Sequence, residues 1–443
     1  LESETVLKNT LLAKYDLIFD YPTLGNFKNQ SLFDYIINEN IITYNSKINN
    51  WEIQKNDFES YEKVFFGNST DFIKLNLDFI TNENLRQSLS LYQRRESTNP
   101  TKENEWDRIQ FCKTKLSLPN DSYFNYLVQF QKDVKDELLI QKIQLEKAFI
   151  LNSQASKDIH PDYNIKAITT LDSILEISNR SNAYKLARQK KENIISKSLN
   201  VQLQKYTYTD ENTRAFIRYK NLDHLTISFF KINQKQLAEF RTLYSKKDSL
   251  TEAIIKKAQP IVSKKYLLTN KKDFFEYTTE VLLPNLKTGS YLVYFESDSD
   301  EKNKKAFAYE TITTTNIMAL ASQGDAKETY QVLDRKTGEP IPNAILKSTY
   351  LNLVTNKKGI AAYKEKKYTY NNEAIQISTA NDTVSIYKNY IFYSSEYDPS
   401  DTTDNNDFKG KVEFYLDRAI YRPGQTLYFK GIAIKKKKNK WQF

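Results

Sequence analysis

Cysteine and histidine are scarce in this sequence of 443 residues, which contains one cysteine, Cys112, and two histidines, His160 and His224. A lone cysteine forms no intramolecular disulfide, and it offers no thiolate cluster for zinc, which structural sites bind with four ligands. The two histidines are far apart in the sequence. These shortages exclude a multi-histidine metal site within the chain.

Glycine, proline and long apolar runs are also sparse. The chain has 9 glycines and 10 prolines, which argues against a collagenous or linker-dominated protein. No apolar run reaches the roughly 18–20 residues that a membrane-spanning helix needs. The first residues, LESET, lack the basic start and apolar core of a signal peptide, so we expect a mature form whose export signal was removed.

Catalytic motifs are missing as well. The sequence contains no Gly-x-Ser-x-Gly, no glycine-rich phosphate loop and no His-Glu-x-x-His. Paired carboxylates occur at Asp133 and Asp136 and at Asp298 and Asp300, where solvation in a loop or on a helix face is the simpler interpretation. The acidic segment 398–407 lacks the spacing and the glycine of an EF-hand. We therefore predict no catalytic, cofactor-binding or metal-binding residues, no cofactor and no enzyme activity.

Charge is plentiful and mixed in sign. The sequence has 65 basic and 55 acidic residues, a formal net charge of +10. The one obvious basic run, residues 435–440, follows a predicted strand and is expected to form a solvated hairpin loop. Nucleic-acid binding would require a clustered basic face with stacking aromatic side chains, and the sequence predicts no such partner.

The first part of the chain, residues 1–200, has apolar side chains at helical spacing. Ser31 is predicted as the N-cap of a helix, with Asp34 at the capping-box position. Further helical segments are expected over residues 51–66 and 72–92. This pattern predicts an α-helical amino-terminal domain.

A break at Pro100 precedes a second helical stretch, which is predicted as one long helix over residues 121–152. Its expected apolar stripe consists of Leu127, Phe130, Val134, Leu138, Ile143 and Leu145. After Pro161, residues 163–195 predict two shorter antiparallel helices. Their layout resembles a tetratricopeptide helix pair, but no clean repeat of about 34 residues is present, so a regular solenoid stays an open alternative.

The conspicuous side chains of this helical part are interpreted as core residues. We expect Trp51 and Trp106 to pack in the interior, and Cys112 to behave as a small buried apolar residue. A nucleophilic Cys112 would need a histidine partner, and neither histidine is near it in sequence.

At about residue 200 the apolar period changes to 2, the signature of half-buried strands. His224 falls in a predicted turn and is expected to be a polar loop residue, while residues 234–258 predict a helical insertion. Strands are expected at 201–203, 214–220, 225–232, 273–283, the part of 283–295 that follows a hinge at Gly289, and 306–312. Several short strands at such spacing predict a sandwich of immunoglobulin-like size.

A second sandwich is expected over residues 318–393. The segment 329–346 predicts two strands around a turn at Thr337-Gly338, and 353–363 predicts a hairpin in which Gly359 supplies the positive φ. The polar segment 394–407 has too little apolar content to pack and is expected to be a loop or linker.

The most informative stretch is residues 411–434, which predicts two strands around a Pro-Gly turn. Its sequence motifs DRAIYRPGQ at 417–425 and YFKG at 428–431 resemble the opening of the second macroglobulin domain of the α2-macroglobulin family. The resemblance is to the large bacterial members, particularly those of Bacteroidetes type. It is strong from about Tyr206 onward, and the helical start matches in character only.

This resemblance implies a helical module followed by macroglobulin-like sandwiches, within a longer polypeptide. The expected parts are a helical domain at 1–200, a macroglobulin-like sandwich at 201–317, a second sandwich with a polar linker at 318–409, and the incomplete start of a further macroglobulin domain at 410–443. Family members trap proteases through a bait segment and, in many cases, a Cys-x-Glu-Gln thioester. Cys112 is followed by Lys113-Thr114-Lys115, so this chain contains no such thioester.

The implied function is therefore that of a framework part of a broad-range endopeptidase inhibitor, exported to the cell envelope of a Gram-negative bacterium. Its implied partners are proteases, contacted through segments downstream. Two alternatives stay open. In the first, the chain is a non-catalytic binding or scaffold subunit of an outer-membrane or cell-surface complex. In the second, it is a hydrolase with a dispersed site, and this is the weakest interpretation because the sequence has only two histidines and no nucleophile motif.

Overall fold

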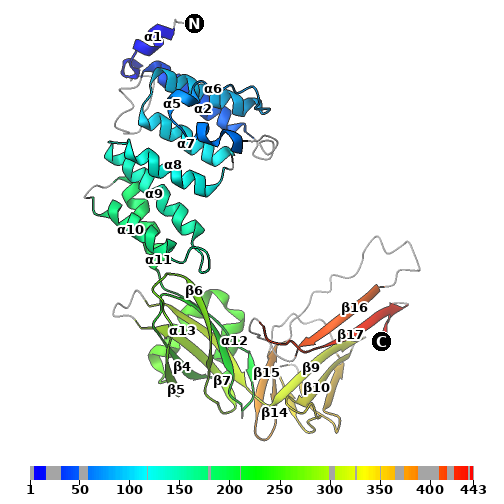
Figure 1. The fold of residues 1–443 in the computed structure, drawn as a ribbon. Coiled ribbons are helices and arrows are strands. Elements are labelled where there is room, and N and C mark those ends of the chain that lie inside the picture. Colours follow the sequence, from blue (N-terminus) through cyan, green and yellow to red (C-terminus); the bar gives the residue numbers. More distant parts are fainter. Residues whose placement is uncertain are drawn as a thin grey trace. The chain divides into compact units, whose positions relative to one another are not determined.

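The computed structural model describes residues 4–15, 31–48, 58–116, 118–177, 181–209, 211–298, 305–324, 327–349, 351–364, 374–387, 409–416, 424–437 and 440–442. The chain forms two compact units, Leu1–Ile194 and Ile195–Phe443. The first is α-helical, and the second is built mainly of antiparallel strands arranged in sandwiches (Figure 1). The predicted fold class, helices followed by β-sandwiches, is therefore confirmed. The exact division into four domains stays a prediction.

The first half of the helical unit begins with short elements and ends with two long helices. Its elements are α1 Glu4–Asn9, η1 Leu12–Tyr15, α2 Leu32–Ser46, η3 Glu59–Tyr61, α4 Glu62–Phe65, α5 Ser69–Phe72, α6 Glu83–Thr98 and α7 Lys102–Leu116. The predicted cap is confirmed, because the Ser31 hydroxyl accepts a hydrogen bond of 3.1 Å from the Asp34 amide. The break at Pro100 is also confirmed. The helix predicted over 72–92 is wrong in part, since residues 73–82 are not helical.

The second half of the helical unit contains α8 Asn120–Lys132, α9 Glu137–Gln154, α10 Tyr163–Leu175 and α11 Asn182–Ile195. The single long helix predicted over 121–152 is wrong. The chain leaves the helix at Asp133 and starts a new one at Asp136, whose Oδ1 accepts a hydrogen bond of 2.7 Å from the Leu139 amide. Leu138, placed on the apolar stripe by the sequence, is 52% exposed.

The helix pair predicted after Pro161 is confirmed by α10 and α11. Its buried faces carry small and aliphatic side chains, namely Ala167, Leu171, Ile174, Ala183, Ala187 and Ile194. Ile165 and Leu186 of the same two helices are exposed.

One continuous apolar core runs from α2 to α9. It includes Trp106 and Cys112, both buried as predicted, whereas Trp51 lies outside the described residues. Burial raises the pKa of the Cys112 thiol to about 12, so the side chain is protonated at neutral pH and acts as an apolar filler. Other large side chains that are fully buried in this core include Phe65, Phe72, Leu85, Leu89, Tyr123 and Leu127.

The first sandwich packs a three-stranded sheet of order β1-β3-β6 on a five-stranded sheet of order β2-β8-β7-β4-β5. Its strands are β1 Ser198–Gln202, β2 Tyr206–Thr207, β3 Arg214–Lys220, β4 His224–Ile232, β5 Val262–Leu267, β6 Glu276–Leu282, β7 Gly289–Ser297 and β8 Phe307–Thr314. The pairs are antiparallel except β2 with β8. Strand β3 occupies the predicted residues, and β5 was missed. His224 is the first residue of β4, so its prediction as a loop residue is wrong.

Two helices cover the outer face of the five-stranded sheet. They are α12 Gln234–Thr242 and α13 Lys247–Lys257, which confirm the predicted helical insertion (Figure 1). Leu237 and Phe240 of α12 and Ile254 of α13 form one core with strand residues Phe230 and Leu292. Because both faces of the sheet are covered, β4 and β7 contain runs of consecutive buried residues instead of a clean alternation.

The second sandwich packs a sheet of order β13-β10-β9 on a sheet of order β12-β11-β14-β15. Its strands are β9 Ile317–Gly324, β10 Lys327–Asp334, β11 Ile345–Lys347, β12 Asn352–Val354, β13 Ile360–Lys364, β14 Ala374–Ser378 and β15 Thr383–Tyr387. Gly359 has the predicted positive φ, at 68°, and Gly338 in the predicted turn has a φ of 75°. The hairpin predicted at 353–363 is wrong, because β12 and β13 belong to different sheets. The linker at 394–407 lies outside the described residues.

The last strands are β16 Lys409–Leu416, β17 Phe429–Lys437 and β18 Lys440–Gln442. Strands β16 and β17 pair antiparallel from Lys409–Lys436 to Leu416–Phe429, which confirms the predicted hairpin. Val412, Phe414 and Leu416 of β16 are exposed, with Phe414 at 63%, whereas Ile432 and Ile434 of β17 are half-buried. The basic run is not simply a loop, because residues 435–437 belong to β17 and Lys440 begins β18.

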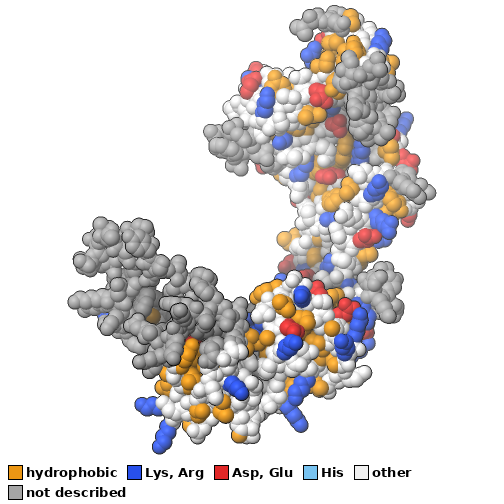
Figure 2. All heavy atoms as spheres, turned by 180° about the vertical axis from the view of Figure 1, so that it is seen from behind, with side chains coloured by type: hydrophobic (Ala, Val, Ile, Leu, Met, Phe, Trp, Pro, Cys, Tyr) orange, Lys and Arg blue, Asp and Glu red, His pale blue; other side chains and the backbone are white. Residues whose placement is uncertain are grey.

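No helix within the described ranges is long and apolar enough to cross a membrane. On the face shown in Figure 2, basic and acidic side chains are interspersed over the helical unit.

Candidate functional site

The carboxylates and histidines singled out from the sequence have structural contacts in the described part of the chain. Asp133 ends α8, and Asp136 caps α9. The Asp298 carboxylate lies 2.5 Å from Lys265 Nζ and 3.6 Å from His224 Nδ1. The His160 ring stacks on Tyr163 with centroids 4.1 Å apart. Of these residues, the structure brings His224 and Asp298 into contact.

Asp300 and the acidic segment 398–407 lie outside the described residues. Among the residues that are described, no group of three or more histidine, cysteine or acidic side chains could hold a metal ion.

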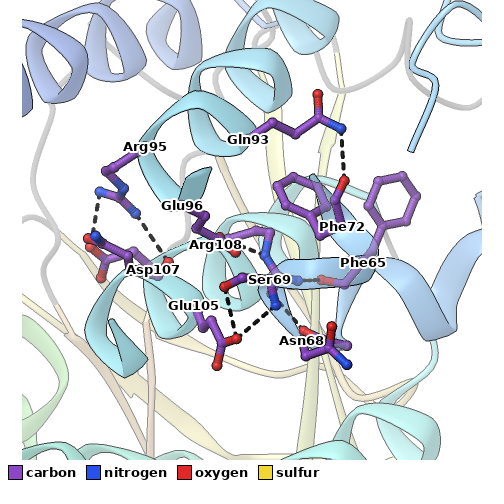
Figure 3. A network of polar contacts seen from close by, with 12 residues as sticks. Phe65, Asn68, Ser69, Phe72, Gln93, Arg95, Glu96, Glu105, Asp107 and Arg108 are labelled. Carbon is purple, nitrogen blue, oxygen red and sulfur yellow. Dashed lines mark hydrogen bonds and ion pairs between the residues drawn. The ribbon is translucent and has the colours of Figure 1, made fainter. Parts of the chain in front are cut away.

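The densest polar network lies inside the helical unit, between α6, α7 and the turn that joins α4 to α5 (Figure 3). Arg108 and Glu96 form an ion pair in which both side chains are fully buried, with Arg108 Nε 2.8 Å from Glu96 Oε1. The other guanidinium nitrogens donate to the carbonyls of Phe65 and Gly67. Burial raises the pKa of Glu96, although the positive charge of Arg108 opposes this shift.

Glu105 extends the network to the start of α5. One carboxylate oxygen accepts hydrogen bonds of 2.8 and 2.9 Å from the Ser69 amide and hydroxyl, and the other lies 2.7 Å from Lys102 Nζ. Burial alone would raise the pKa of Glu105, but these hydrogen bonds outweigh it and lower the pKa below its usual value. The network therefore joins α7 to the α4–α5 turn through ion pairs and hydrogen bonds.

A hollow of about 480 Å³ lies next to this network, between α2, α6 and α7. Arg95 of α6 forms part of its wall. Its Nη1 donates to Asn38 Oδ1 at 2.9 Å and lies 3.4 Å from Asp107 Oδ2, while Nη2 donates to the Asn104 carbonyl at 3.3 Å. The guanidinium carbon lies 4.9 Å from the centroid of the Tyr92 ring. Arg95 and Asp107 appear at the edge of Figure 3.

The hollow combines polar and apolar walls. The side chains that line it are Asn38, Ile41, Ile42, Asn45, Tyr92, Arg95, Asp107, Gln110, Phe111, Thr114 and Lys115. Sequence reasoning missed this place, because charges on α6 and α7 follow the pattern of solvent-exposed helix faces. The only available signal was the density of arginine and glutamate around residues 94–108, where helices are otherwise apolar on one side.

A second polar cluster connects the two sandwiches within the β unit. The Arg241 guanidinium of α12 lies 4.4 Å from the centroid of the Tyr387 ring on β15, and the Ser385 hydroxyl donates to Gln234 Oε1 at 2.6 Å. Asp382 Oδ2 accepts hydrogen bonds from the Thr315 hydroxyl and the Asn316 amide at 2.8 and 2.7 Å. These contacts fix the second sandwich to the first through side chains of α12 and of the β8–β9 connection.

Solved structures similar to this chain include α2-macroglobulin of Escherichia coli. A crystal structure spanning its domains MG0-NIE-MG1 is 12% identical over 44% of this chain and 64% of that one, with a TM-score of 0.33. The cryo-EM reconstruction of its native conformation is 13% identical over 54% of this chain and 16% of that one, with a TM-score of 0.32. Red sea bream transglutaminase is 9% identical over 47% of this chain and 32% of that one, with a TM-score of 0.21.

This chain thus spans less than two thirds of the length of both of these α2-macroglobulin structures. No family model matches the sequence, and no curated protein matches it.

Proposed function

We propose that this chain is the framework part of an α2-macroglobulin-like endopeptidase inhibitor of the bacterial cell envelope. The observation that carries the proposal is the hairpin of β16 and β17. The motif at 417–425 and 428–431, which resembles the opening of the second macroglobulin domain, spans the connection between these two paired strands. It follows two sandwiches in the chain, the order that the resemblance implies.

The architecture supports a structural role in place of a catalytic one. Each described sandwich has its own apolar core, and the fully buried Arg108 and Glu96 of the helical unit are paired with each other. The polar contacts between α12 and β15 fix the spacing of the sandwiches, as a frame requires. The proposed domain boundaries are 1–200, 201–317, 318–409 and 410–443, and the proposed partners are proteases reached through other segments of the protein.

The test is a protection assay with the complete product of the gene that encodes this chain. After incubation with trypsin, chymotrypsin or elastase, the trapped protease should still cleave a small chromogenic peptide but lose most activity on a large protein substrate. Residues 1–443 alone should give no protection, because the family places its bait and thioester elsewhere. Full retention of activity on the large substrate with all three proteases would refute the proposal.

The alternative is a non-catalytic scaffold subunit at the cell surface. One observation favours it, namely the exposure of Val412, Phe414, Leu416 and Phe429 on the last hairpin. Copurification of a stable outer-membrane partner with the complete protein, together with no protection of proteases, would select this alternative.

A further inference from the structure

Strand β9 is the last strand of its sheet, whose order is β13-β10-β9. It pairs with β10 over its whole length, from Gly324 opposite Lys327 to Ile317 opposite Asp334. One side of β9 is thus bonded to β10, and its other side is an open edge within the described part of the chain. An open strand edge presents unpaired backbone N–H and C=O groups, which form a template for another strand.

The register shows which residues direct their backbone groups to this open edge. Just before β9, the Arg335 amide donates to the carbonyl of Asn316, the opposed residue, at 2.8 Å. Hydrogen-bonded and non-hydrogen-bonded pairs alternate along an antiparallel ladder, so Leu320 bonds to β10, whereas Ala319 and Ala321 direct their N–H and C=O groups away from it. Leu320 is 46% exposed, and Ala321 is exposed as well.

The composition of β9 distinguishes it from the other long edge strands. Proteins usually protect an open edge with charged side chains, with proline or with a bulge. Among the described edge strands of six or more residues, β5, β6 and β16 each contain lysine or glutamate. The sequence of β9, IMALASQG, contains no charged residue and no proline. Strand β9 therefore lacks the usual protection against pairing.

This sequence also suits pairing with a second copy of itself. An antiparallel pair of β9 strands centred on Leu320 places Ala319 of each copy opposite Ala321 of the other, and these are the residues whose backbone groups face outward. Each such pair can exchange both of its N–H···O bonds. The two Leu320 side chains then lie opposite each other in a non-hydrogen-bonded pair, where cross-strand side chains are closest. No charge on β9 would face a like charge.

We propose that β9 is the self-association surface of this protein, through which two copies join their β13-β10-β9 sheets into one continuous sheet. The hydrogen bonds of Ala319 and Ala321 hold the pair together, and contact between the two Leu320 side chains removes both from water. Ile317 contributes less, because its carbonyl already accepts a hydrogen bond of 3.0 Å from Arg335 Nη2. The framework function does not require this contact, so the inference goes beyond it.

The test is sedimentation velocity of chain 1–443 at micromolar to submillimolar concentrations. The unmodified chain should show a reversible, concentration-dependent rise of the sedimentation coefficient from monomer towards dimer. Leu320→Lys and Leu320→Glu each place like charges opposite one another and remove an apolar contact, so each alone should weaken association about tenfold. A mixture of the two variants should recover association, because unlike charges then lie opposite each other. This recovery also requires that both variants are folded.

Two further variants separate strand pairing from general apolar association. Leu267→Lys changes a leucine that is 81% exposed on β5, another edge strand, and should leave association unchanged. Ala321→Pro removes an N–H that β10 does not use, so it should abolish association without breaking the pairing of β9 with β10. Circular dichroism of each variant checks that the fold is kept.

Three results would overturn the proposal. The first is a chain that stays monomeric at every concentration. The second is association that Leu320→Lys leaves unchanged, which would assign the contact to another surface, such as the exposed side chains of β16. The third is no recovery in the mixture while each variant is folded, which would show that Leu320 does not face its own copy. Protease protection is measured separately, so none of these results decides the proposed inhibitor function.

Discussion

The helical unit and the β unit solve the problem of a stable interior differently. In the helical unit, a fully buried arginine and glutamate lie within the core and bind the backbone carbonyls of a turn. In the sandwiches, aliphatic and aromatic side chains from facing sheets form the apolar cores, and the buried polar side chains are mostly hydroxyl groups, with Glu328 of β10 as a buried charge. Both units are large enough to bury an apolar core, so the buried charges of the first are not a substitute for one.

This difference shows which interactions specify a single packing arrangement in each unit. A sandwich is specified by strand register, since a shift of one residue would turn every core side chain to the solvent. Helices can slide and rotate with a smaller penalty. The Arg108–Glu96 pair fixes α7 against α6 and the α4–α5 turn, at a desolvation cost that apolar side chains would not incur.

The largest effect is expected when one partner of the buried Arg108–Glu96 pair is removed, because this tests whether the helical unit depends on its buried charges. Arg108→Met should destabilise the helical unit by about 3–5 kcal/mol, because it leaves the Glu96 carboxylate and two carbonyls buried and unpaired. Urea unfolding followed by circular dichroism at 222 nm measures the loss.

The matched control is Arg188→Met, which breaks an exposed pair with Glu192 on α11 and should change stability by less than about 0.5 kcal/mol. The double variant Arg108→Met with Glu96→Leu should recover most of the loss. Equal stability of Arg108→Met and Arg188→Met would contradict the role assigned to the buried pair.

The β unit should be most sensitive at a backbone position. Gly359 has a φ of 68°, and a Cβ there would lie 2.4 Å from the Val332 carbonyl oxygen. Gly359→Ala should therefore cost about 3 kcal/mol, because it combines a left-handed conformation with a backbone clash. Gly338→Ala is the control, with a φ of 75° and no atom within 4 Å, and should cost about 1 kcal/mol. Thermal unfolding compares the two, and a larger loss at Gly338 would refute the clash.

A smaller effect is expected at the start of α9. Asp136→Ala removes the side chain that caps the Leu139 amide and should destabilise the helical unit by about 1 kcal/mol. Asp136→Asn keeps a capping oxygen and should lose only a few tenths of a kcal/mol. If alanine and asparagine are equivalent in urea unfolding, the cap does not account for the break between α8 and α9.

The smallest effect concerns the junction of the sandwiches. Arg241→Ala removes the stacking on Tyr387 and should cost about 0.5–1 kcal/mol. It should also increase limited trypsin cleavage between the sandwiches, while Lys256→Ala on α13, which pairs only with the exposed Glu252, should not. Unchanged cleavage in both variants would show that Arg241 does not hold the junction.

The sequence predicted the local elements better than their partners. Strand β3 was placed correctly because the buried residues Ala215, Ile217 and Tyr219 recur at every second position, although Phe216 interrupts the polar series between them. The segment around Gly359 looked like a hairpin because a positive-φ glycine between two strands is the usual signal, yet this signal does not say whether the strands share a sheet. Here the chain crosses from one sheet to the other at that glycine.

In the helical unit, the break between α8 and α9 was missed because apolar spacing continues through Asp133 and Asp136 with little change of phase. The buried network was missed for a different reason. Arg108, Glu96 and Glu105 have the charges of a solvated helix face, and only their three-dimensional partners show that they lie in the interior. The hollow beside Arg95 depends on the same packing, so sequence periodicity could not locate it.

The helical insertion between β4 and β5 has a consequence for any shortening of the chain. Phe230 and Leu292 share one apolar core with α12 and α13. A variant that lacks residues 234–258 would expose an apolar patch at Phe230 and Leu292 on the five-stranded sheet. We expect such a variant to self-associate unless both residues are also replaced by polar ones. The two helices and the sheet face beneath them therefore depend on each other to keep this apolar surface out of water.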